Sequence, residues 1–482
     1  MIPDEGLLNE VAGLAEWPLV LLGSIPQEFM DVPEEILQTS MRTHQKYFSL
    51  RDPKSGKMAN RFALVANMIA EDGGKEIIAG NERVLRARLS DAKFFWDEDR
   101  KVKLADRVDA LKGIVFHAKL GTQYERVERI AGLAGEIAGK IGGDAKKAER
   151  AARLAKADLT TGVVGEFPEL QGVMGRYYAL HDGEASDVAN AIRDHYKPVG
   201  PSDVVPSEKI GIAVALADKI DSLVGFFAVG DRPTGSGDPY ALRRAALGVT
   251  RIILGNNLRI PLQRTFGLGL DQYLVQENPS VRESFNNAAS KFIDLDEQLR
   301  ANWNFYHGEG VANFISDRLK VALKEKGVRH DLIDAVFALG HEDDLVRLVA
   351  RVEALQSFLK TDDGANLLAG YKRAANILKA EEKKDNKTYI SEVHESLLAA
   401  LPEKNLYAAL EKVKSAIAPA LEKEDFAGAM RLMASLRGPV DAFFDGVKVN
   451  DENPKLRENR LNLLASLRAT LHQVADFSRI EG

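Results

Sequence analysis

The chain has 482 residues, with 65 Lys and Arg against 71 Asp and Glu, so its formal charge is −6. This balance argues against a general nucleic-acid coat or a binder of anionic membranes, and any nucleic-acid contact must come from local basic patches. The sequence contains no cysteine, which excludes disulfides, thiolate zinc sites and cysteine nucleophiles. A chain of this length is expected to fold as several domains.

Apolar runs are short throughout the sequence. The run Trp17-Pro18-Leu19-Val20-Leu21-Leu22 is typical, and it is far too short to span a membrane. The first residues, Met1 to Glu5, lack the basic start and apolar stretch of a signal peptide. We therefore expect a soluble, cytoplasmic protein with no membrane partner.

The first hundred residues mix β-prone runs with helical stretches. Pro18–Leu22, Tyr47–Leu50 and Phe62–Ala66 are short apolar runs, and the turn residues of Asp52–Gly56 separate the second from the third. This pattern predicts a small α/β domain over residues 1–100.

From Asp99 onward the pattern is almost wholly helical. Apolar residues recur at spacings of three and four in Tyr124–Ile141, Ala145–Leu159 and Ile210–Val224. A loop rich in Gly and Pro follows at 230–239 and leads into a predicted helix over Tyr240–Leu254. We predict a helical domain at 101–265 and a weakly patterned helical connector at 266–335.

The last predicted unit, residues 336–482, is also helical. Its first helix starts near Asp343. Two later helices, one after Gly438 and one from about Leu456, carry apolar stripes such as Val440 with Phe443 and Leu461 with Leu464. The predicted fold class is therefore mainly α, with a small N-terminal α/β piece.

Two groups of polar residues in the last unit are candidates for contact with a nucleic acid. Arg457 and Arg460 lie one helical turn apart, and planar guanidinium groups suit phosphates and base edges. Lys372, Arg373 and Asn376 share another helix, where cations can neutralise phosphates while the amide bonds a base edge. The alternatives are a solvated helix face for the arginines and a buried polar network for Asn376.

Two further arginine pairs occur earlier in the chain. Arg83 and Arg86 are one turn apart and suit either an RNA backbone or an acidic protein surface, unless they pair with nearby acidic residues. Arg243 and Arg244 follow Asp238, which we predict to cap a helix with Pro239 in its first turn. A helix N-terminus beside arginines can receive a phosphate, although these arginines can also pair within the chain.

Several distinctive sequence blocks occur in a fixed order: His44–Phe48, Gly80–Leu89, Asp91–Phe95, Leu120–Thr122, Gly165–Gly175, His181–Glu184 and Asp238–Gly248. Together they resemble one family, the beta subunit of the bacterial two-subunit glycyl-tRNA synthetase. The C-terminal unit, with its block Tyr371–Ile377, resembles the DALR-type anticodon-binding domain that is also found in arginyl-tRNA synthetase.

The resemblance implies a function for the whole assembly rather than for this chain alone. The beta subunit would bind tRNA(Gly) and dock with a catalytic alpha subunit in a heterotetramer of two alpha and two beta subunits, which uses ATP and Mg²⁺ to make glycyl-tRNA. We expect no catalytic residue and no cofactor site in this chain. The resemblance begins abruptly near Leu7, so we expect the chain to be truncated at its N-terminus.

The domain at 101–265 resembles the HD superfamily of metal-dependent phosphohydrolases. The positions of its metal ligands correspond here to Tyr124, the pair Ala157 and Asp158, and Asp218. A phenol and a methyl group do not replace the neutral imidazoles that would bind the metal, so we expect no metal site and an HD-like helical body. The pair His181 and Asp182 is expected to be a loop after a helix. An active HD-type phosphohydrolase, and a scaffold that binds the alpha subunit without RNA, remain as alternative functions.

Overall fold

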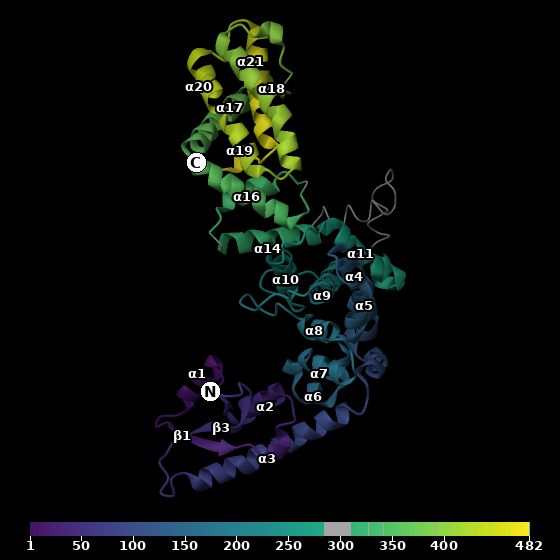
Figure 1. Ribbon diagram of the computed structural model, residues 1–482. Coiled ribbons are helices and arrows are strands. Elements are labelled where there is room, and N and C mark those ends of the chain that lie inside the picture. Colours follow the sequence, from purple (N-terminus) through teal and green to yellow (C-terminus); the bar gives the residue numbers. More distant parts are fainter. Residues whose placement is uncertain (284–309, 326, 341, 391, 482) are drawn as a thin grey trace. The chain divides into compact units, whose positions relative to one another are not determined.

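The computed structural model describes residues 1–283, 310–325, 327–340, 342–390 and 392–481 (Figure 1). The chain divides into two compact units. The first contains Met1–Arg232 and the segment that begins at Leu268, and the second contains Pro233–Gly267 and the C-terminal part of the chain. We describe each unit by itself.

The first unit begins with a small α/β part. Its antiparallel sheet has the strand order β1-β3-β2, with Leu22 of β1 opposite Ala63 of β3. Helix α1 covers part of one face, where Leu7 and Val11 pack against Phe48 and Ala63. The elements are α1 (Glu5–Leu14), β1 (Leu19–Ser24), α2 (Glu34–Ser40), β2 (Phe48–Arg51), β3 (Met58–Ala66) and α3 (Lys75–Asp99).

The long helix α3 connects this part to the helical part of the same unit (Figure 1). Its last residue, Asp99, is buried and accepts hydrogen bonds from the backbone N–H groups of Gly162 (2.8 Å) and Val163 (3.0 Å). The Tyr178 hydroxyl donates to the same carboxylate at 2.8 Å. Asp99 therefore satisfies backbone donors at the start of α6 (Gly162–Glu166) and fixes the end of α3 against the helical part.

The helical part has α4 and α9 at its centre. Thr122 and Glu125 form a reciprocal capping box at the start of α4, and the apolar stripe of α4 is buried. Apart from two short strands, β4 (Val115–His117) and β5 (Gly121–Thr122), this part is helical. Its helices are α4 (Gln123–Lys140), α5 (Ala145–Leu154), α6 (Gly162–Glu166), α7 (Val173–His181), α8 (Ser186–Asp194) and α9 (Lys209–Ala228), with α11 (Leu262–Val275) contributing from Leu268 onward.

The second unit is a helical bundle. In its C-terminal part, Tyr371 of α17, Phe443 of α20 and Leu464 of α21 are buried, as the apolar spacing predicts. Its helices are α10 (Leu242–Gly255), α14 (Val311–Glu325), α15 (His330–Phe337), α16 (Leu345–Leu359), α17 (Asp362–Asp385), α18 (Leu401–Glu422), α19 (Phe426–Ala434), α20 (Arg437–Gly446) and α21 (Pro454–His472).

The observed fold confirms the predicted class, which was mainly α with a small N-terminal mixed part. The predicted connector at 266–335 falls partly on residues 284–309, outside the described residues, so the division into four domains stays a prediction. Within the described ranges, none of the helices combines the length and the apolarity needed to cross a membrane.

The predicted helix at Tyr240 begins two residues later than expected. Ala241 has a left-handed conformation (φ 55°), which excludes it from the helix. Asp238 nevertheless caps α10, because its carboxylate accepts from the N–H groups of Leu242 (2.8 Å) and Arg243 (3.0 Å).

Candidate nucleic-acid interface

Helix α17 carries a row of cations on the side that faces away from its core. Leu367, Tyr371, Ala374 and Leu378 are buried on one side of the helix. At 100° per residue, the row falls on the opposite side. We call this row the α17 stripe, and it consists of Lys372, Asn376, Lys379 and Lys383.

The lysines of the α17 stripe have no acidic partner within the described residues. Asn376, Lys379 and Lys383 are exposed, and Lys372 is partly buried. The exposure of Asn376 excludes the alternative in which it closes a buried polar network. Free ammonium groups in a row, with an amide between them, can bind successive phosphates and one base edge.

Arginines of α21 neutralise the acidic residues of α17. Arg457 donates to the carboxylates of Glu381 and Asp385, the latter at 2.6 Å, and Arg468 donates to Glu382 at 3.0 Å. A hydrogen bond from Arg457 holds the pKa of Glu381 below the ordinary value, and hydrogen bonds from Tyr389 and Arg457 do the same for the pKa of Asp385. Because the arginines of α21 neutralise these carboxylates, the acidic residues of α17 do not cancel the positive charge of the α17 stripe.

A cation and an aromatic ring lie next to the α17 stripe. The guanidinium carbon of Arg373 is 4.4 Å from the centroid of the Phe444 ring on α20. Arg373 is exposed and Phe444 is partly buried. Arginine and aromatic side chains are the groups on which unpaired bases stack, and here the two lie in contact.

Arg460, by contrast, belongs to an internal ion-pair network. Its Nε donates to the buried carboxylate of Glu403 on α18, and its Nη1 donates to Asp451 (2.6 Å) and to the carbonyl of Lys448 (2.9 Å). Only 10% of the Arg460 side chain is exposed, and 20% of that of Arg457. The expectation that Arg457 and Arg460 present free guanidinium groups is therefore wrong, because carboxylates distant in sequence fold onto both.

At the start of α10, the two predicted arginines differ. Arg243 donates to the carbonyl groups of Gly235 (2.7 Å) and Gly237 (3.3 Å), so it stabilises the preceding loop. Arg244 is exposed and has no ion-pair partner in the part of the chain that the structure describes. Only Arg244 is therefore available to an external phosphate.

The arginines of α3 lie on its solvent side. Arg83 is exposed without an acidic partner among the described residues, and Arg86 is 3.7 Å from the carboxylate of Glu28, both side chains being largely exposed. An exposed ion pair of that length contributes little to stability. In the described part of the chain, neither arginine pairs with the nearby acidic residues that the sequence offers as alternative partners, which are Asp91, Asp97, Glu98 and Asp99.

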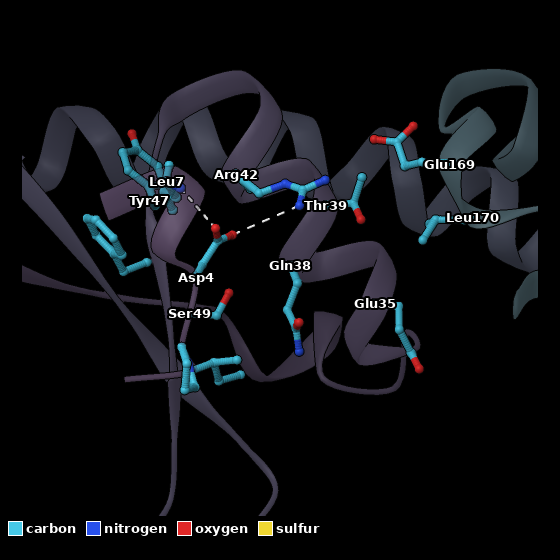
Figure 2. Close-up of a pocket in the computed structure, with 13 residues that line it drawn as sticks. Asp4, Leu7, Glu35, Gln38, Thr39, Arg42, Tyr47, Ser49, Glu169 and Leu170 are labelled. Carbon is cyan, nitrogen blue, oxygen red and sulfur yellow. Dashed lines mark hydrogen bonds and ion pairs between the residues drawn. The ribbon is translucent and has the colours of Figure 1, made fainter. Parts of the chain in front are cut away.

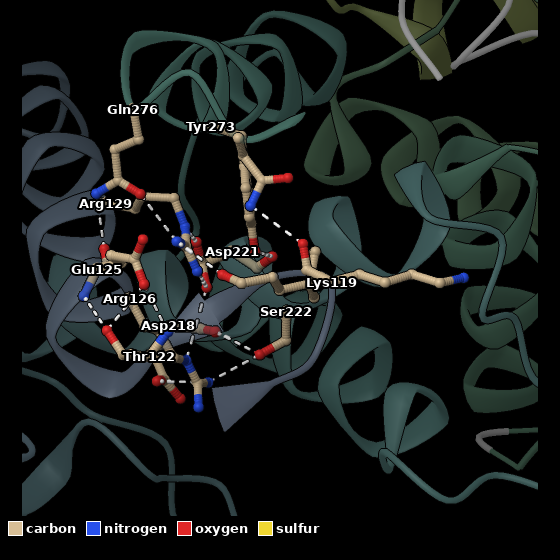
Figure 3. Close-up of polar contacts among 12 residues, drawn as sticks. Lys119, Thr122, Glu125, Arg126, Arg129, Asp218, Asp221, Ser222, Tyr273 and Gln276 are labelled. Atoms are coloured by element: carbon tan, nitrogen blue, oxygen red, sulfur yellow. Dashed lines mark hydrogen bonds and ion pairs between the residues drawn. The ribbon is translucent and has the colours of Figure 1, made fainter. Parts of the chain in front are cut away.

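The HD-like positions hold ion pairs. Asp218 on α9 pairs with Arg126 at 3.0 Å, and Arg129 on α4 pairs with Asp221 at 2.7 Å (Figure 3). Lys156 also pairs with Asp218, at 3.0 Å. Figure 3 shows the two arginines pointing toward the carboxylates of α9. Cations therefore surround the carboxylate that would bind a metal in the HD superfamily.

The charges of this network are coupled. Burial alone would raise the pKa of Asp218, but the charges of Lys156 and Arg126 outweigh it and hold the pKa far below the ordinary value. Burial lowers the pKa of Lys156 to about 8 despite the attraction of Asp218. Such a network stabilises a particular packing of α4 against α9, because removal of one partner leaves an uncompensated buried charge.

The other HD-like positions are structural as well. Asp158 is fully buried and accepts from the N–H groups of Gly172 (2.5 Å) and Gly175 (3.0 Å). Ala157 is buried, and the ring of Tyr124 lies 4.5 Å from the ammonium group of Lys112. Within the described ranges, no three His, Cys, Asp or Glu side chains are grouped as a metal site requires.

His181 and Asp182 lie at the C-terminal end of a helix, so only Asp182 is in the loop that the sequence predicts for both. His181 is the last residue of α7, and the Asp182 carboxylate accepts from the N–H of Leu104 at 2.6 Å. The pair therefore connects two segments of the helical part.

A cavity of about 270 Å³ lies beside α2 in the first unit (Figure 2). Its wall contains the carboxylates of Asp4, Glu35 and Glu169 and one cation, Arg42, which is 4.0 Å from Asp4. Because acidic groups predominate, this cavity is unsuited to phosphates.

Sequence reasoning missed several residues of these sites. Lys379 and Lys383 extend the predicted cluster, and their spacing could have shown this. The role of Phe444 has no signal in the sequence, since its contact with Arg373 depends on the fold.

Comparisons with known proteins match two parts of the chain to described families. Residues 1–338 match the family described as "Glycyl-tRNA synthetase beta subunit", and residues 367–480 match the "DALR anticodon binding domain". The chain is 53% identical to the glycine–tRNA ligase beta subunit of Phenylobacterium zucineum (strain HLK1), with 100% of this chain and 66% of that protein covered. It is 56% identical to the protein of the same name from Rhodospirillum centenum (strain ATCC 51521 / SW), with 99% of this chain and 64% of that protein covered.

The chain thus spans slightly less than two thirds of the length of these curated relatives. The family match nevertheless extends over more than half of the chain, and the DALR match contains the whole α17 stripe. On these grounds, the chain belongs to the family of glycyl-tRNA synthetase beta subunits.

Proposed function

We propose that this chain binds tRNA(Gly) and positions it for ATP-dependent glycylation at the active site of a partner alpha subunit. The observation that carries the proposal is the α17 stripe, a row of uncompensated cations in a region that matches an anticodon-binding domain. The relatives' shared name, glycine–tRNA ligase beta subunit, supports the identity of the tRNA and of the partner.

The residues around the α17 stripe suit an unpaired RNA loop. Lys372, Lys379 and Lys383 would neutralise backbone phosphates, while Asn376 would bond a base edge. The Arg373–Phe444 pair would stack an unpaired base. In this proposal, neither Arg457 nor Arg460 contacts the RNA.

The catalytic benefit would come from orientation. A tRNA that is held at its anticodon and along the helical body presents its terminal adenosine to the partner's activated glycine, which removes much of the entropic cost of bringing the two together. ATP and Mg²⁺ would act at the alpha subunit. We propose the assembly to be a heterotetramer of two alpha and two beta subunits in the cytoplasm.

The direct test mixes this chain with a cognate alpha subunit and measures glycine charging of tRNA(Gly). Each subunit alone should be inactive, and the mixture should charge tRNA(Gly). Binding of tRNA(Gly) by this chain alone provides a second measurement that does not depend on assembly. If the chain binds the alpha subunit but not tRNA, the scaffold alternative is correct.

The alternative of an HD-type phosphohydrolase has little support. Arg126 and Lys156 form ion pairs with the carboxylate of Asp218. Two of the four metal-ligand positions of the HD superfamily hold Tyr124 and Ala157. Release of phosphate from nucleotides or phosphoesters by the purified chain in the presence of divalent metals would restore this alternative.

A further inference from the structure

Helix α3 has one packed side and one bare side. Leu85, Leu89, Ala92 and Trp96 are buried on the packed side, against the sheet and the helical part of the first unit. The opposite side is exposed along the middle of the helix. An amphipathic helix normally exposes polar residues, so the composition of the bare side is informative.

Apolar and small residues form most of a regular row on the bare side, and Asp91 is the one carboxylate within that row. Val84 is 49% exposed and Phe94 is 59% exposed, and both are among the large apolar side chains that the structure leaves in solvent. We call this row the α3 ridge, and its residues recur at alternating spacings of four and three: Gly80, Val84, Ala87, Asp91 and Phe94. That spacing is the one by which a helix presents a straight seam to another helix.

Arginines flank the α3 ridge on both sides. At 100° per residue, Arg83 lies on one side of Val84 and Arg88 on the other. Neither has an acidic partner within ion-pair distance among the described residues, so both retain all their hydrogen-bond donors. Two small residues of the ridge, Gly80 and Ala87, leave room for a close approach, since a Cβ at Gly80 would meet nothing within 4 Å.

We propose that the α3 ridge is a docking surface for an amphipathic helix of a second protein chain, one whose apolar row is flanked by carboxylates. The apolar residues would cover Val84 and Phe94, and the carboxylates would pair with Arg83 and Arg88. From Val84 to Phe94 the seam is about 15 Å long, which corresponds to almost three turns of a partner helix.

The composition of the ridge favours a protein over RNA. A phosphate backbone would pair with the arginines but offers nothing to the aliphatic Val84, which lies between them. A protein helix satisfies both the exposed apolar area and the charges. The partner that we assign is the alpha subunit, an assignment that rests on the proposed function.

The experiment measures two affinities for each variant of the full chain: that for the purified cognate alpha subunit, by calorimetry, and that for tRNA(Gly), by filter binding. One variant, Val84→Glu with Phe94→Glu, changes the ridge, and a second, Arg83→Glu with Arg88→Glu, changes the flanks. A matched control, Lys372→Glu with Lys379→Glu, changes the α17 stripe. All six residues lie on solvent-facing sides of their helices, and circular dichroism verifies that each variant folds.

We expect both α3 variants to lose about tenfold or more in affinity for the alpha subunit and to keep their affinity for tRNA(Gly). The control should show the opposite pattern. The proposal is overturned if the α3 variants bind the alpha subunit as the unchanged chain does. It is also overturned if the flank variant loses tRNA binding and keeps the alpha subunit, because α3 would then be an RNA surface. An unchanged chain that binds neither molecule would reject the proposed function together with this docking surface.

Discussion

Helices α17 and α21 contact each other in the second unit, and both are rich in cations, yet they use them differently. Among the residues that the structure describes, the lysines of the α17 stripe have no acidic partner, whereas Arg457, Arg460 and Arg468 of α21 pair with carboxylates of α17 and α18. The spacing of charges along a sequence thus identifies a helix face. Whether that face reaches solvent is decided by the helices that pack on it.

The two helices are also linked in function. The arginines of α21 compensate the carboxylates of Glu381, Glu382 and Asp385, which would otherwise oppose an RNA near the α17 stripe. Arg457 is therefore a positioning and neutralising residue in this account, and the α17 stripe is the contact surface.

The largest effect should come from Arg460. Replacement by Ala leaves the buried carboxylate of Glu403 without its main partner, and loss of one member of such a pair costs about 3–5 kcal/mol. Urea unfolding measured by circular dichroism should show this loss. A double variant, Arg460→Met with Glu403→Gln, should recover part of it. A change within about 0.5 kcal/mol for Arg460→Ala would mean that the ion pair is weak and that Arg460 is available to RNA.

The next effect should be on RNA affinity. Changing Lys372, Lys379 and Lys383 to Ala should weaken binding of tRNA(Gly) by about 10- to 100-fold at low salt, because three phosphate contacts are lost. The stability of the protein should be almost unaffected, since the side chains make no internal ion pair among the described residues. Filter binding measures the affinity, and a triple Ala variant of exposed Lys404, Lys412 and Lys423 is the control.

A smaller effect on tRNA affinity should show whether Arg457 neutralises acidic residues of α17 or contacts the RNA itself. Arg457→Ala uncovers the charges of Glu381 and Asp385, so tRNA affinity should fall by about threefold to tenfold through repulsion. Adding Glu381→Gln and Asp385→Asn should restore the affinity, because no uncompensated carboxylate remains. If the triple variant stays as weak as Arg457→Ala, then Arg457 contacts phosphates directly.

A separate effect, on stability as a function of pH, concerns the buried carboxylate of Asp158 in the first unit. Burial raises its pKa to about 6, so between about pH 4 and pH 6 the folded chain binds more protons than the unfolded chain. The contribution of this group to stability is therefore complete at low pH and is lost as the pH rises through 6. The Asp158→Asn variant has no carboxyl group at this position, so its urea midpoint should not show the fall with rising pH that this group causes in the unchanged chain. An identical pH profile for both proteins would show that Asp158 has an ordinary pKa.

Much of the fold could be predicted from local pattern, but the pairing of charges could not. The apolar stripes around Tyr371 and Phe443 indicate which helix faces are buried, and the structure confirms them. The spacing of Lys372 and Asn376 likewise indicates a solvent face. The pairing of Arg460 with Glu403 connects residues 57 positions apart, and nothing local in the sequence specifies it.

A signal for the HD-like network was present in the sequence. Arg126 and Arg129 occur three residues apart within the apolar helix α4, and Asp218 and Asp221 have the same spacing within the apolar helix α9. Matched spacing of opposite charges on two buried helices predicts that they pair. The contribution of Lys156 depends on the packing and could not be predicted in this way.

The most direct test is the salt dependence of tRNA(Gly) binding, measured for three proteins in parallel. Each phosphate contact contributes about 0.7–0.9 to the slope of log affinity against log salt. Without the three lysines of α17 the slope should therefore become shallower by about 2 to 3, whereas the combined Arg457→Ala, Glu381→Gln and Asp385→Asn variant should keep the slope of the unchanged chain. If the slope becomes shallower only in the combined variant that lacks Arg457, the RNA contacts the arginines of α21, and the α17 stripe is not the RNA-binding surface.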